Sequence, residues 1–408
     1  MTEEGITVKI LGAGVFFIFL FTPSADHLTA IGFLISLITF CLLLRGPLKS
    51  YIFFNLPLIL LLFSGFVSLI FSFNKRASLI SLLCLSTGMI VFYIITVYMS
   101  FKPEKIRSLL LCLIISFSIM VITGLLQFIF NRYNTWMDVE ISPGVIEHRG
   151  RLTSLFIFPN GFSAYLVMSL PVILGALRIE GTGFLKRIFL IFISLISLVC
   201  LVSTYSRAGW IGFAVSIVLM GYLSARKKRV LLLSLLIFSI IGISLFLFLQ
   251  RETLKSFLFH NYSDQSRQFI WAKSIKMIKD HPLTGIGIGN FYYVYPRYIL
   301  QGEEKLPEEV SHPWHAHNLF LNIAVEMGLP ALCFFLWFIF RLLKEFFCSA
   351  EKKGEFNQIL YGIISGLIGF IIFNHIDFVM GDLKNGLYLF IVLAFGSGLV
   401  KATERKEI

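Results

Sequence analysis

Residues 108–130 read SLLLCLIISFSIMVITGLLQFIF, a run of apolar and small polar residues that contains no charge. A helix of this length crosses the roughly 30 Å of a bilayer's hydrocarbon core. Similar runs recur along the 408 residues, of which 57% are hydrophobic and 14% charged, with a mean hydropathy of +0.84. Because the backbone must satisfy its own hydrogen bonds in lipid, we expect these runs to be helices. The sequence therefore predicts an all-α polytopic membrane protein.

Twelve such spans are predicted, all within one membrane domain that covers residues 1–408. Basic residues gather in alternate loops, and the positive-inside rule places those loops and both termini in the cytoplasm. Two outer intervals are long, the first at residues 131–160 and the second at residues 250–317, which holds the candidate active site. The predicted spans lie near residues 6–22, 28–44, 51–73, 78–99, 108–130, 161–177, 188–203, 207–224, 230–249, 318–340, 357–376 and 385–400.

The positive net charge of the chain is better explained by membrane orientation than by nucleic-acid binding. The net charge is +12, but the lysines and arginines stand in short clusters at alternate loops, as an orientation signal does. We therefore expect membrane lipids as partners and no nucleic acid. The six cysteines lie in predicted spans or an inner loop and lack the spacing of a metal site, so free, buried thiols are expected.

The second outer interval contains a predicted short amphipathic helix. Ser266 would cap this helix, and Pro282 would stop it soon after its end. Trp271, Ile275 and Ile278 would share one face at helical spacing. With lysines on its other faces, the helix is expected to lie along the membrane surface.

After this helix the chain reads HPLTGIGIGN at residues 281–290. The alternating glycines resemble a nucleotide-binding loop only superficially, because no strand precedes them and no βαβ unit is possible here. A tight turn is the expected structure. The aromatic run that follows suits an interfacial belt or the stacking of sugars, and it comprises Phe291, Tyr292, Tyr293, Tyr295 and Tyr298.

Four arginines in the outer segments are candidates for binding an anionic substrate. Arg207 follows a very tight connection at the outer end of the eighth span, among small residues that let a helix or a substrate approach closely. Arg267 opens the amphipathic helix, where a guanidinium fork and helix amides favour phosphate oxygens. Arg149 and Arg151 can act in the same way. The alternative is an arginine that snorkels to the interface at 207 and solvated surface charges at the other positions.

His317 begins the tenth span, with Asn318 as a possible cap. The positive end of the helix dipole disfavours a protonated imidazole, so the position favours a neutral histidine that can act as a general base. The alternative is a boundary histidine that only fills an interface position. His312 and His315 are close competitors. Three histidines at i, i+3 and i+5 without an obvious carboxylate argue against a zinc site.

Acidic residues offer fewer candidates. Asp138 and Glu140 form the closest acidic pair in the outer loops, and they make a poor metal site, so no metal is expected. Glu326 lies about two turns inside the tenth span, where an ionisable group is costly and tends to be functional. It can equally be a structural acceptor for neighbouring backbone or serine groups.

The topology sends Arg151, Arg207, Arg267 and His317 to one outer face, although they come from four separate segments. Guanidinium groups can neutralise a polyprenyl diphosphate leaving group without a divalent ion. A neutral histidine can remove the proton of an attacking sugar hydroxyl. A flippase or transporter for the lipid-linked glycan is the alternative from another class, but a transporter is expected to place its charges along a midplane pathway, often with internal repeats.

These segments resemble the O-antigen ligase family over roughly residues 150–335, in their order, separation and placement around one large outer loop. The family consists of multi-span bacterial proteins and also includes O-antigen polymerases and some protein O-oligosaccharyltransferases. A second glycine usually follows the Gly328-Leu329-Pro330 turn, whereas this chain has Ala331. The matching pieces are Gly150-Arg151-Leu152-Thr153 with Pro159-Asn160; Ser206-Arg207-Ala208-Gly209-Trp210; Ser266-Arg267 with Trp271; His281-Pro282-Leu283-Thr284-Gly285-Ile286-Gly287; and His317-Asn318 with Glu326-Met327-Gly328-Leu329-Pro330.

The resemblance implies a GT-C-like helical fold and metal-independent glycan transfer from undecaprenyl diphosphate, without a cofactor. Carried onto this chain, the family's essential arginines fall on Arg207 and Arg267, and its essential histidine falls on His317. Further candidates for contacts with the diphosphate or glycan are Tyr205 and Trp271, beside the arginines at 149 and 151. Supporting roles are expected for Asn318, Glu326 and His315.

The expected function is that of an O-antigen ligase. Such an enzyme would move a finished polysaccharide from undecaprenyl diphosphate to a sugar hydroxyl of the lipid A core, with inversion of the anomeric centre. We expect it in the bacterial inner membrane with the active site on the periplasmic face. A polymerase that joins repeat units needs the same parts and differs only in its acceptor, so the sequence leaves that alternative open.

Overall fold

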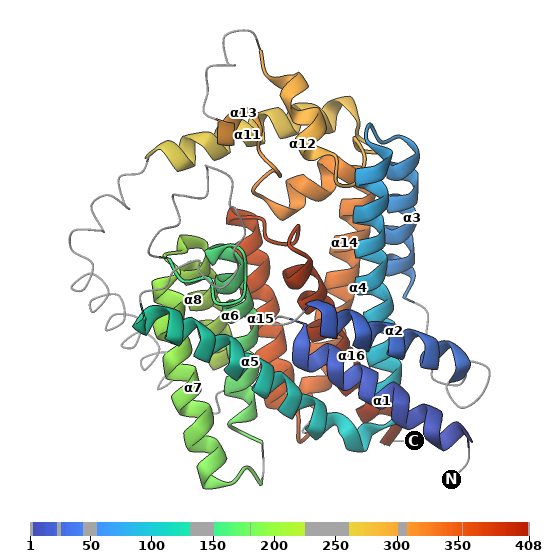
Figure 1. Ribbon diagram of the computed structural model, residues 1–408, viewed down its shortest axis with the longest axis vertical. Coiled ribbons are helices and arrows are strands. Elements are labelled where there is room, and N and C mark those ends of the chain that lie inside the picture. Colours follow the sequence, from blue (N-terminus) through green and yellow to red (C-terminus); the bar gives the residue numbers. More distant parts are fainter. Residues whose placement is uncertain are drawn as a thin grey trace.

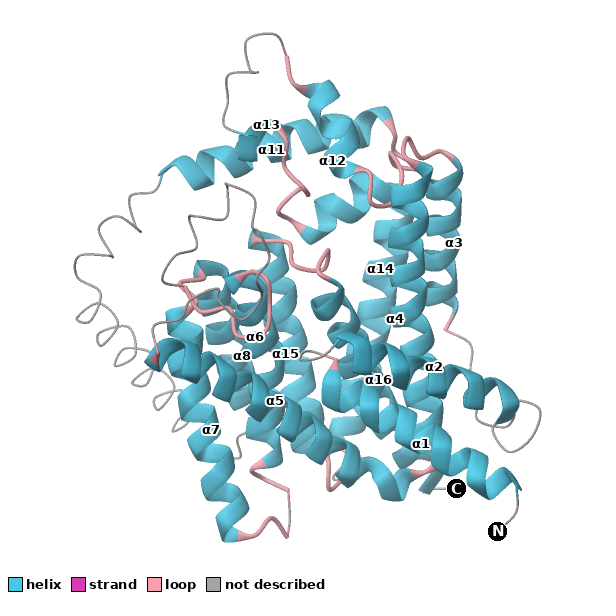
Figure 2. Ribbon diagram, in the orientation of Figure 1, coloured by secondary structure: helices cyan, strands magenta, loops and turns pink. Residues whose placement is uncertain are grey.

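The structure, a computed structural model, describes residues 3–22, 26–43, 55–130, 151–179, 181–224, 261–300, 308–352 and 354–406. These residues form helices joined by turns and loops, and no strand occurs among them (Figure 2). The predicted all-α fold is therefore confirmed. The predicted span at 230–249 lies outside the described residues, as do Arg149, Asp138 and Glu140.

Every other predicted span coincides with a helix. Eight helices of the described residues are long and apolar enough to cross a membrane, and α1, α2 and α3 contain shorter apolar segments. The elements are α1 (Glu3–Phe21), α2 (Asp26–Leu43), α3 (Leu56–Ile70), α4 (Lys75–Phe101), η2 (Pro103–Lys105), α5 (Ile106–Ile129), α6 (Pro159–Ala176), α7 (Phe184–Ser203), α8 (Arg207–Ser224), α11 (Asn261–Asp280), α12 (Phe291–Val294), η4 (Tyr295–Tyr298), α13 (Glu308–Ser311), α14 (Leu319–Glu351), α15 (Asn357–Ile376) and α16 (Leu383–Lys406).

The short helices of the second outer interval stand at one end of the molecule. Figure 1 shows α11, α12 and α13 across the top of the bundle, while the N- and C-termini both lie at the bottom. Helices α3, α4 and α14 run side by side, and α15 packs against α6 and α8. The predicted arrangement, in which both termini lie opposite the second outer interval, thus agrees with the fold.

Helix α15 is held by direct contact of its backbone with two neighbours. Gly362 and Gly366 press on α6, and a Cβ at either position would lie 2.5 Å from the carbonyl oxygen of Pro171 or of Met168. Gly369 presses in the same way on α8, where a Cβ would lie 2.4 Å from the carbonyl oxygen of Gly212. Small residues at i, i+4 and i+7 allow this approach. This close backbone packing fixes the C-terminal end of α15 against the beginnings of α6 and α8.

Helix α14 bends where the glycine-rich loop meets it. Gly328 has φ 84° and ψ 169°, so the helical path breaks there and resumes after it. The N–H of Leu329 donates to the carbonyl of Pro282 at 2.8 Å. Gly285 also has positive φ, and a Cβ on it would lie 2.3 Å from the backbone of Glu326. The predicted tight turn is confirmed, and its neighbour is the bend of α14.

Helix α11 starts earlier than the sequence predicts. It covers Asn261–Asp280, so Ser266 lies inside the helix and the predicted cap is wrong. The predicted stop is confirmed, because the helix ends two residues before Pro282. A serine favours the cap position but is also tolerated inside a helix. Here the five residues before Ser266 are themselves helical, so Ser266 is an interior residue.

The buried face of α11 also differs from the predicted one. Ile270 and Met277 are buried, whereas Ile275 is 47% exposed. Trp271 and Ile278 are half-buried at the border of this face. The predicted buried face is therefore wrong, because it was inferred from the spacing of apolar residues within α11 alone. Packing of α11 onto α14 and α13 determines which face is buried.

The cysteines are free, as predicted, but most are not buried within the protein. Cys200 is buried and Cys112 is half-buried. The other four are exposed on the outside of the helices, where a small apolar side chain can face lipid, and the expectation of burial is wrong for them: Cys41, Cys84, Cys333 and Cys348.

Candidate active site

Three segments meet at the end of the bundle where α11, α12 and α13 lie. One is the segment at 312–318 before α14, the second follows the end of α15 at Ile376, and the third leads into α6 at Pro159. Helix α15 packs against both α6 and α14, and this packing brings the three segments together. More than two hundred residues separate the start of α6 from the end of α15 in the chain.

The imidazole of His317 contacts a buried carboxylate. His317 Nδ1 lies 3.1 Å from Asp377 Oδ1, and the Asp377 side chain is 6% exposed against 32% for His317. Burial raises the pKa of Asp377, but the hydrogen bond with His317 and the charges of His317 and Arg267 outweigh burial and lower that pKa to about 2. An ionised carboxylate only accepts hydrogen bonds. In the neutral imidazole Nδ1 therefore carries the proton, and Nε2 keeps its lone pair.

The carboxylate is fixed from its other side by the start of α6. Asn160 donates from Nδ2 to Asp377 Oδ2 and accepts at Oδ1 from Nη2 of Arg151 at 2.9 Å. Burial lowers the pKa of Arg151, and the charge of Asp377 partly offsets that effect. A chain of polar contacts thus runs from Arg151 through Asn160 and Asp377 to His317.

Arg151 also holds the turn between α7 and α8. Its Nε donates to the carbonyl of Thr204 at 2.8 Å, and its Nη2 lies 3.4 Å from the carbonyl oxygen of Tyr205. Arg207, the first residue of α8, follows directly and is half-buried. The predicted tight connection at this point is confirmed. The contacts make Arg151 a residue that positions the turn carrying Arg207.

The small residues around Arg207 allow close packing, as the sequence predicts. Gly209 faces Ser163 of α6, and a Cβ on Gly209 would lie 1.7 Å from Ser163 Oγ. The indole Nε1 of Trp210 donates to the carbonyl of Leu201 at 3.2 Å, which ties the beginning of α8 back to α7. These contacts set the direction in which α8 leaves the turn.

Helix α11 covers the site from outside. Trp271 Nε1 donates to the carbonyl of Ala316 at 3.0 Å, so the helix is attached to the residue before His317. Arg267 lies one turn earlier on α11 and is half-buried. Its positive charge lowers the pKa of both His315 and Asp377, which places its guanidinium within electrostatic reach of the imidazole pair.

His315 is a neutral neighbour of His317. The two ring centroids lie 4.4 Å apart, and Nδ1 of His315 accepts from the backbone N–H of His317 at 3.3 Å. Burial lowers the pKa of His315 to about 3, with help from the charges of His317 and Arg267 and against that of Asp377. His315 therefore stays an acceptor at neutral pH.

Asparagines fix the loop that presents His317. Asn318 Oδ1 accepts from the N–H groups of Phe320 and Leu321, so the predicted cap is confirmed. Its Nδ2 donates to the carbonyl of His375 at 2.9 Å, which joins the start of α14 to the end of α15. Asn322 Oδ1 accepts from the N–H of Ala316 at 3.1 Å.

Backbone strain marks the same region. Among the described residues, the non-glycine residues with positive φ are Ser154, Tyr205 and His317, at 51°, 50° and 47°. Such conformations cost about 1–3 kcal/mol each and persist only where the surrounding contacts enforce them. Two of the three are His317, the candidate base, and Tyr205, which lies two positions before Arg207. Holding both in these conformations lowers the stability of the folded protein.

Glu326 lies away from the imidazole pair and supports the glycine-rich loop. Its Oε1 accepts from the N–H of Phe291 at 3.2 Å. Its backbone carbonyl accepts from Ser68 Oγ at 2.6 Å and from the N–H of Gly287 at 3.1 Å. These contacts match the structural-acceptor alternative. His312 is exposed, and its Nδ1 contacts the hydroxyl of Ser311.

Two residues of the site, Asp377 and Asn160, were not predicted from the sequence. Asp377 closes the segment His375-Ile376-Asp377 at the outer end of the eleventh span, and that placement on the predicted outer face was the available signal. Asn160 stood within a matched motif but had been given no role. Both were overlooked because their partners come from distant parts of the chain, so no local spacing relates them to His317.

Comparison with known proteins points to one family. Residues 192–336 match the sequence model of a family described as O-antigen ligase. A protein named "Putative polysaccharide ligase" from Rickettsia conorii is 26% identical over 182 residues, which cover 41% of this chain and 42% of that protein. A protein of the same name from Rickettsia prowazekii is 27% identical over 178 residues, covering 39% and 42%.

The chain thus matches about two fifths of the length of these curated relatives. The matched family region contains the Arg207 turn, Arg267, Trp271 and the His317 loop, which are the parts that the fold brings to one end of the bundle. Over residues 192–336, the chain is therefore similar to the O-antigen ligase family.

Proposed function

We propose that this protein is a polysaccharide ligase that transfers a glycan from a polyprenyl diphosphate, undecaprenyl diphosphate in bacteria, to a sugar hydroxyl of the lipid A core. The observation that carries the proposal is the contact of His317 with the ionised Asp377 under the positive charge of Arg267. An oriented base with a cation in electrostatic reach suits the attack of a hydroxyl on a diphosphate-activated sugar.

In the proposed reaction His317 acts on the acceptor. Nε2 takes the proton of the attacking hydroxyl, whose oxygen forms a bond to the anomeric carbon of the donor sugar. The bond from that carbon to the diphosphate oxygen breaks, and the diphosphate leaves with the electron pair. Asp377 holds the imidazole by Nδ1 and stabilises the imidazolium that forms. Direct displacement of this kind inverts the anomeric centre.

The arginines act on the leaving group. Arg207 is the first residue of α8, and Arg267 lies in the N-terminal part of α11. The guanidinium forks of both residues suit the oxygens of a diphosphate. Arg151 acts indirectly, because its N–H groups contact Asn160 and the carbonyls of the turn before Arg207. The proposed site faces the periplasm in the inner membrane.

An exposed indole in the histidine loop, stacked on a half-buried tyrosine, supports a glycan substrate. Trp314 is 75% exposed and stacks on Tyr292, with ring centroids 4.5 Å apart and planes 17° from parallel. Trp314 lies three residues before His317, so the two Cα atoms are at most about 11 Å apart. A flat, open indole at this distance suits the apolar face of a sugar ring.

A lipopolysaccharide gel of a deletion strain tests the proposal. Loss of a ligase leaves bare core and lets long glycan accumulate on the lipid carrier, whereas loss of a polymerase leaves core capped by a single repeat. Complementation with Arg267→Ala or His317→Ala is expected to restore the membrane protein without restoring transfer. A normal ladder in the deletion strain, or full transfer by either variant, contradicts the assignment.

A further inference from the structure

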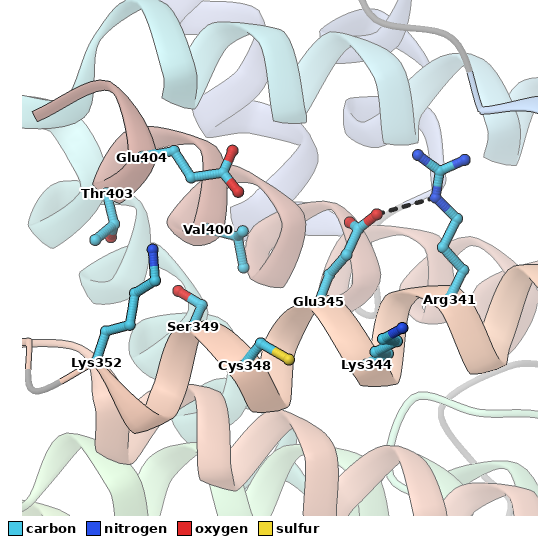
Figure 3. Close-up of a pocket in the computed structure, with 9 residues that line it drawn as sticks. All are labelled: Arg341, Lys344, Glu345, Cys348, Ser349, Lys352, Val400, Thr403 and Glu404. Atoms are coloured by element: carbon cyan, nitrogen blue, oxygen red, sulfur yellow. Dashed lines mark hydrogen bonds and ion pairs between the residues drawn. The ribbon is translucent and has the colours of Figure 1, made fainter. Parts of the chain in front are cut away.

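A cavity of about 450 Å³ lies between the C-terminal parts of α14 and α16, at the opposite end of α14 from the His317 loop (Figure 3). Helical spacing creates its walls, because α14 contributes residues at i, i+3, i+4, i+7 and i+8, and α16 contributes residues at i, i+3 and i+4. By the predicted topology this is the cytoplasmic end of both helices.

The cavity carries charges of both signs. Arg341 and Lys344 of α14 line it together with Lys352, the residue after α14, and the carboxylates of Glu345 and Glu404 face it from α14 and α16 (Figure 3). Arg341 Nε donates to Glu345 Oε1 at 2.9 Å, and both side chains are partly exposed. A purely anionic ligand would meet two carboxylates here, and a simple cation would meet three basic groups. A zwitterion finds a partner for each of its charges.

An exposed apolar stripe borders the charged cavity. Phe340 is 68% exposed and Phe347 is 40% exposed, and they flank Lys344 at i−4 and i+3 on the surface of α14. Helix α14 is long and apolar enough to cross a membrane, so lipid chains are the expected neighbours of these rings. A charged cavity beside a lipid-facing stripe fits a phospholipid, whose headgroup and acyl chains occupy both at once.

We propose that the cavity between α14 and α16 binds the phosphoethanolamine headgroup of a membrane phospholipid. The phosphate pairs with Lys344 and Lys352, the ammonium pairs with Glu345 and Glu404, and the acyl chains run along the exposed phenylalanines. This site is independent of the proposed transfer reaction, because it lies at the other end of α14 and shares no residue with the candidate active site.

Native mass spectrometry of the full-length protein in detergent tests this site. The protein is incubated with equal concentrations of dioleoyl phosphatidylethanolamine and dioleoyl phosphatidylglycerol, and separately with water-soluble phosphoethanolamine. We expect the ethanolamine lipid to be retained about two- to tenfold better than the glycerol lipid, the range that two partly exposed ion pairs provide. Phosphoethanolamine alone is expected to leave no adduct, because it has no chains for the apolar stripe.

Two double variants separate the contributions. Glu345→Gln with Glu404→Gln removes the partners of the ammonium, so the preference is expected to turn toward phosphatidylglycerol. Lys344→Gln with Lys352→Gln is expected to reduce the retention of both lipids. The matched control replaces exposed basic residues elsewhere, Lys186→Gln with Arg187→Gln on α7, and is expected to keep the wild-type preference.

Three results would overturn the proposal. One is equal retention of both lipids by the wild type, and another is an unchanged preference in the glutamate double variant. The third is an adduct with phosphoethanolamine as abundant as that with the lipid, which would assign the cavity to a soluble metabolite. Monodisperse elution of each variant in size-exclusion chromatography ensures that a lost adduct reflects the site and not an unfolded protein.

Discussion

His317 and Asp377 share one hydrogen bond, and the chemistry of the candidate site depends on its direction. The carboxylate is ionised at neutral pH, so it can only accept a hydrogen bond from the N–H at Nδ1. The lone pair of Nε2 is then available to act as a base. The charge of Arg267 helps to keep this carboxylate ionised, and the contact with Asn160 holds it in place. Removal of its charge is therefore expected to affect the rate more than the binding of substrate.

Asp377→Asn keeps the size of this side chain but removes the anion. The amide cannot stabilise the imidazolium and can present a donor to Nδ1, so we expect kcat for glycan transfer to fall by about 10²- to 10⁴-fold with little change in KM. The measurement is single-turnover transfer by the purified protein. Retention of more than a tenth of the wild-type kcat would mean that Asp377 only supports the fold.

His315 is expected to make the protein sensitive to acid. Its pKa is about 3 in the folded protein, against about 6.5 for an unfolded chain, so the unfolded state binds more protons as pH falls below about 6.5. Stability thus decreases on acidification, by at most about 1.4 kcal/mol per pH unit. We expect His315→Gln to flatten the dependence of the melting temperature on pH between 7 and 5.

The control for this experiment is His281→Gln, which replaces an exposed histidine and is expected to leave the pH dependence as in the wild type. If His315→Gln follows the wild-type curve across the same range, the acid sensitivity arises elsewhere. The carboxylate of Asp377 does not contribute in this window, because its folded pKa of about 2 and its ordinary value of about 4 both lie below pH 5.

Trp314→Ala tests the proposed sugar platform. Loss of the indole is expected to raise the KM for the glycan about two- to tenfold, the worth of one aromatic stacking contact, with a smaller change in kcat. Trp337→Ala removes a similarly exposed ring from the lipid-facing side of α14 and serves as the control. An unchanged KM in Trp314→Ala, measured with the same donor, would make the indole an interfacial anchor.

At the scale of elements, the bend of α14 joins the site to the rest of the bundle. The bend at Gly328 receives the loop that contains Gly285, and Glu326 ties that loop to α14 and α3. The glycines of HPLTGIGIGN predicted the turn, whereas the span predicted at 318–340 was continuous and did not include the break at Gly328. Ala331, where the family usually has glycine, is fully buried and helical, so the bend needs only the first glycine.

Gly328→Ala is expected to destabilise the protein more than an alanine at an open position. A Cβ at 328 has the unfavourable φ of 84° and also lies 2.3 Å from the carbonyl oxygen of Leu283, so both strain and a clash oppose it. Gly181→Ala shares the positive φ, at 77°, but meets no atom within 4 Å. Strain alone costs about 1–3 kcal/mol.

Thermal unfolding followed by tryptophan fluorescence compares the two variants. Gly181→Ala reports the cost of the backbone conformation, and any larger loss in Gly328→Ala reports the contact with the loop. Equal melting temperatures would show that the loop moves aside at little cost, and the bend would then have no part in holding the site.

At the scale of the whole molecule, the fold separates two ends. Helices α11, α12 and α13 stand at one end, and both termini stand at the other (Figure 1). The alternation of basic loops predicts that the end with the termini is cytoplasmic. A green fluorescent protein fused after residue 408 is therefore expected to fluoresce, and alkaline phosphatase fused after Arg297 is expected to be active.

Phosphatase fused after Ser224, at the C-terminal end of α8, is the control and is expected to be inactive. The reverse pattern, with a dark C-terminal fusion and an active phosphatase after Ser224, would place the histidine loop in the cytoplasm. A ligase that acts on the outer leaflet would then have its base on the wrong side of the membrane.

Apolar runs by themselves determined the helical membrane fold, because lipid leaves a spanning backbone no other way to satisfy its hydrogen bonds. Turn residues located the glycine-rich turn, the positions of the predicted spans located the tight connection before Arg207, and the family motifs named Arg207, Arg267 and His317 as candidates. Local pattern did not determine which face of α11 is buried, because that choice depends on contacts with α14.

Only the tertiary structure decided what His317 contacts. Asp377 contacts His317 from 60 positions away in the chain, and Asn160, 157 positions away from His317, holds Asp377 from its other side because glycines let α15 lie directly on α6. A hydrogen bond of 3.1 Å between side chains depends on helix ends placed to within a fraction of an ångström. Such placement follows from the packing of whole helices, so no pattern within one segment can specify it.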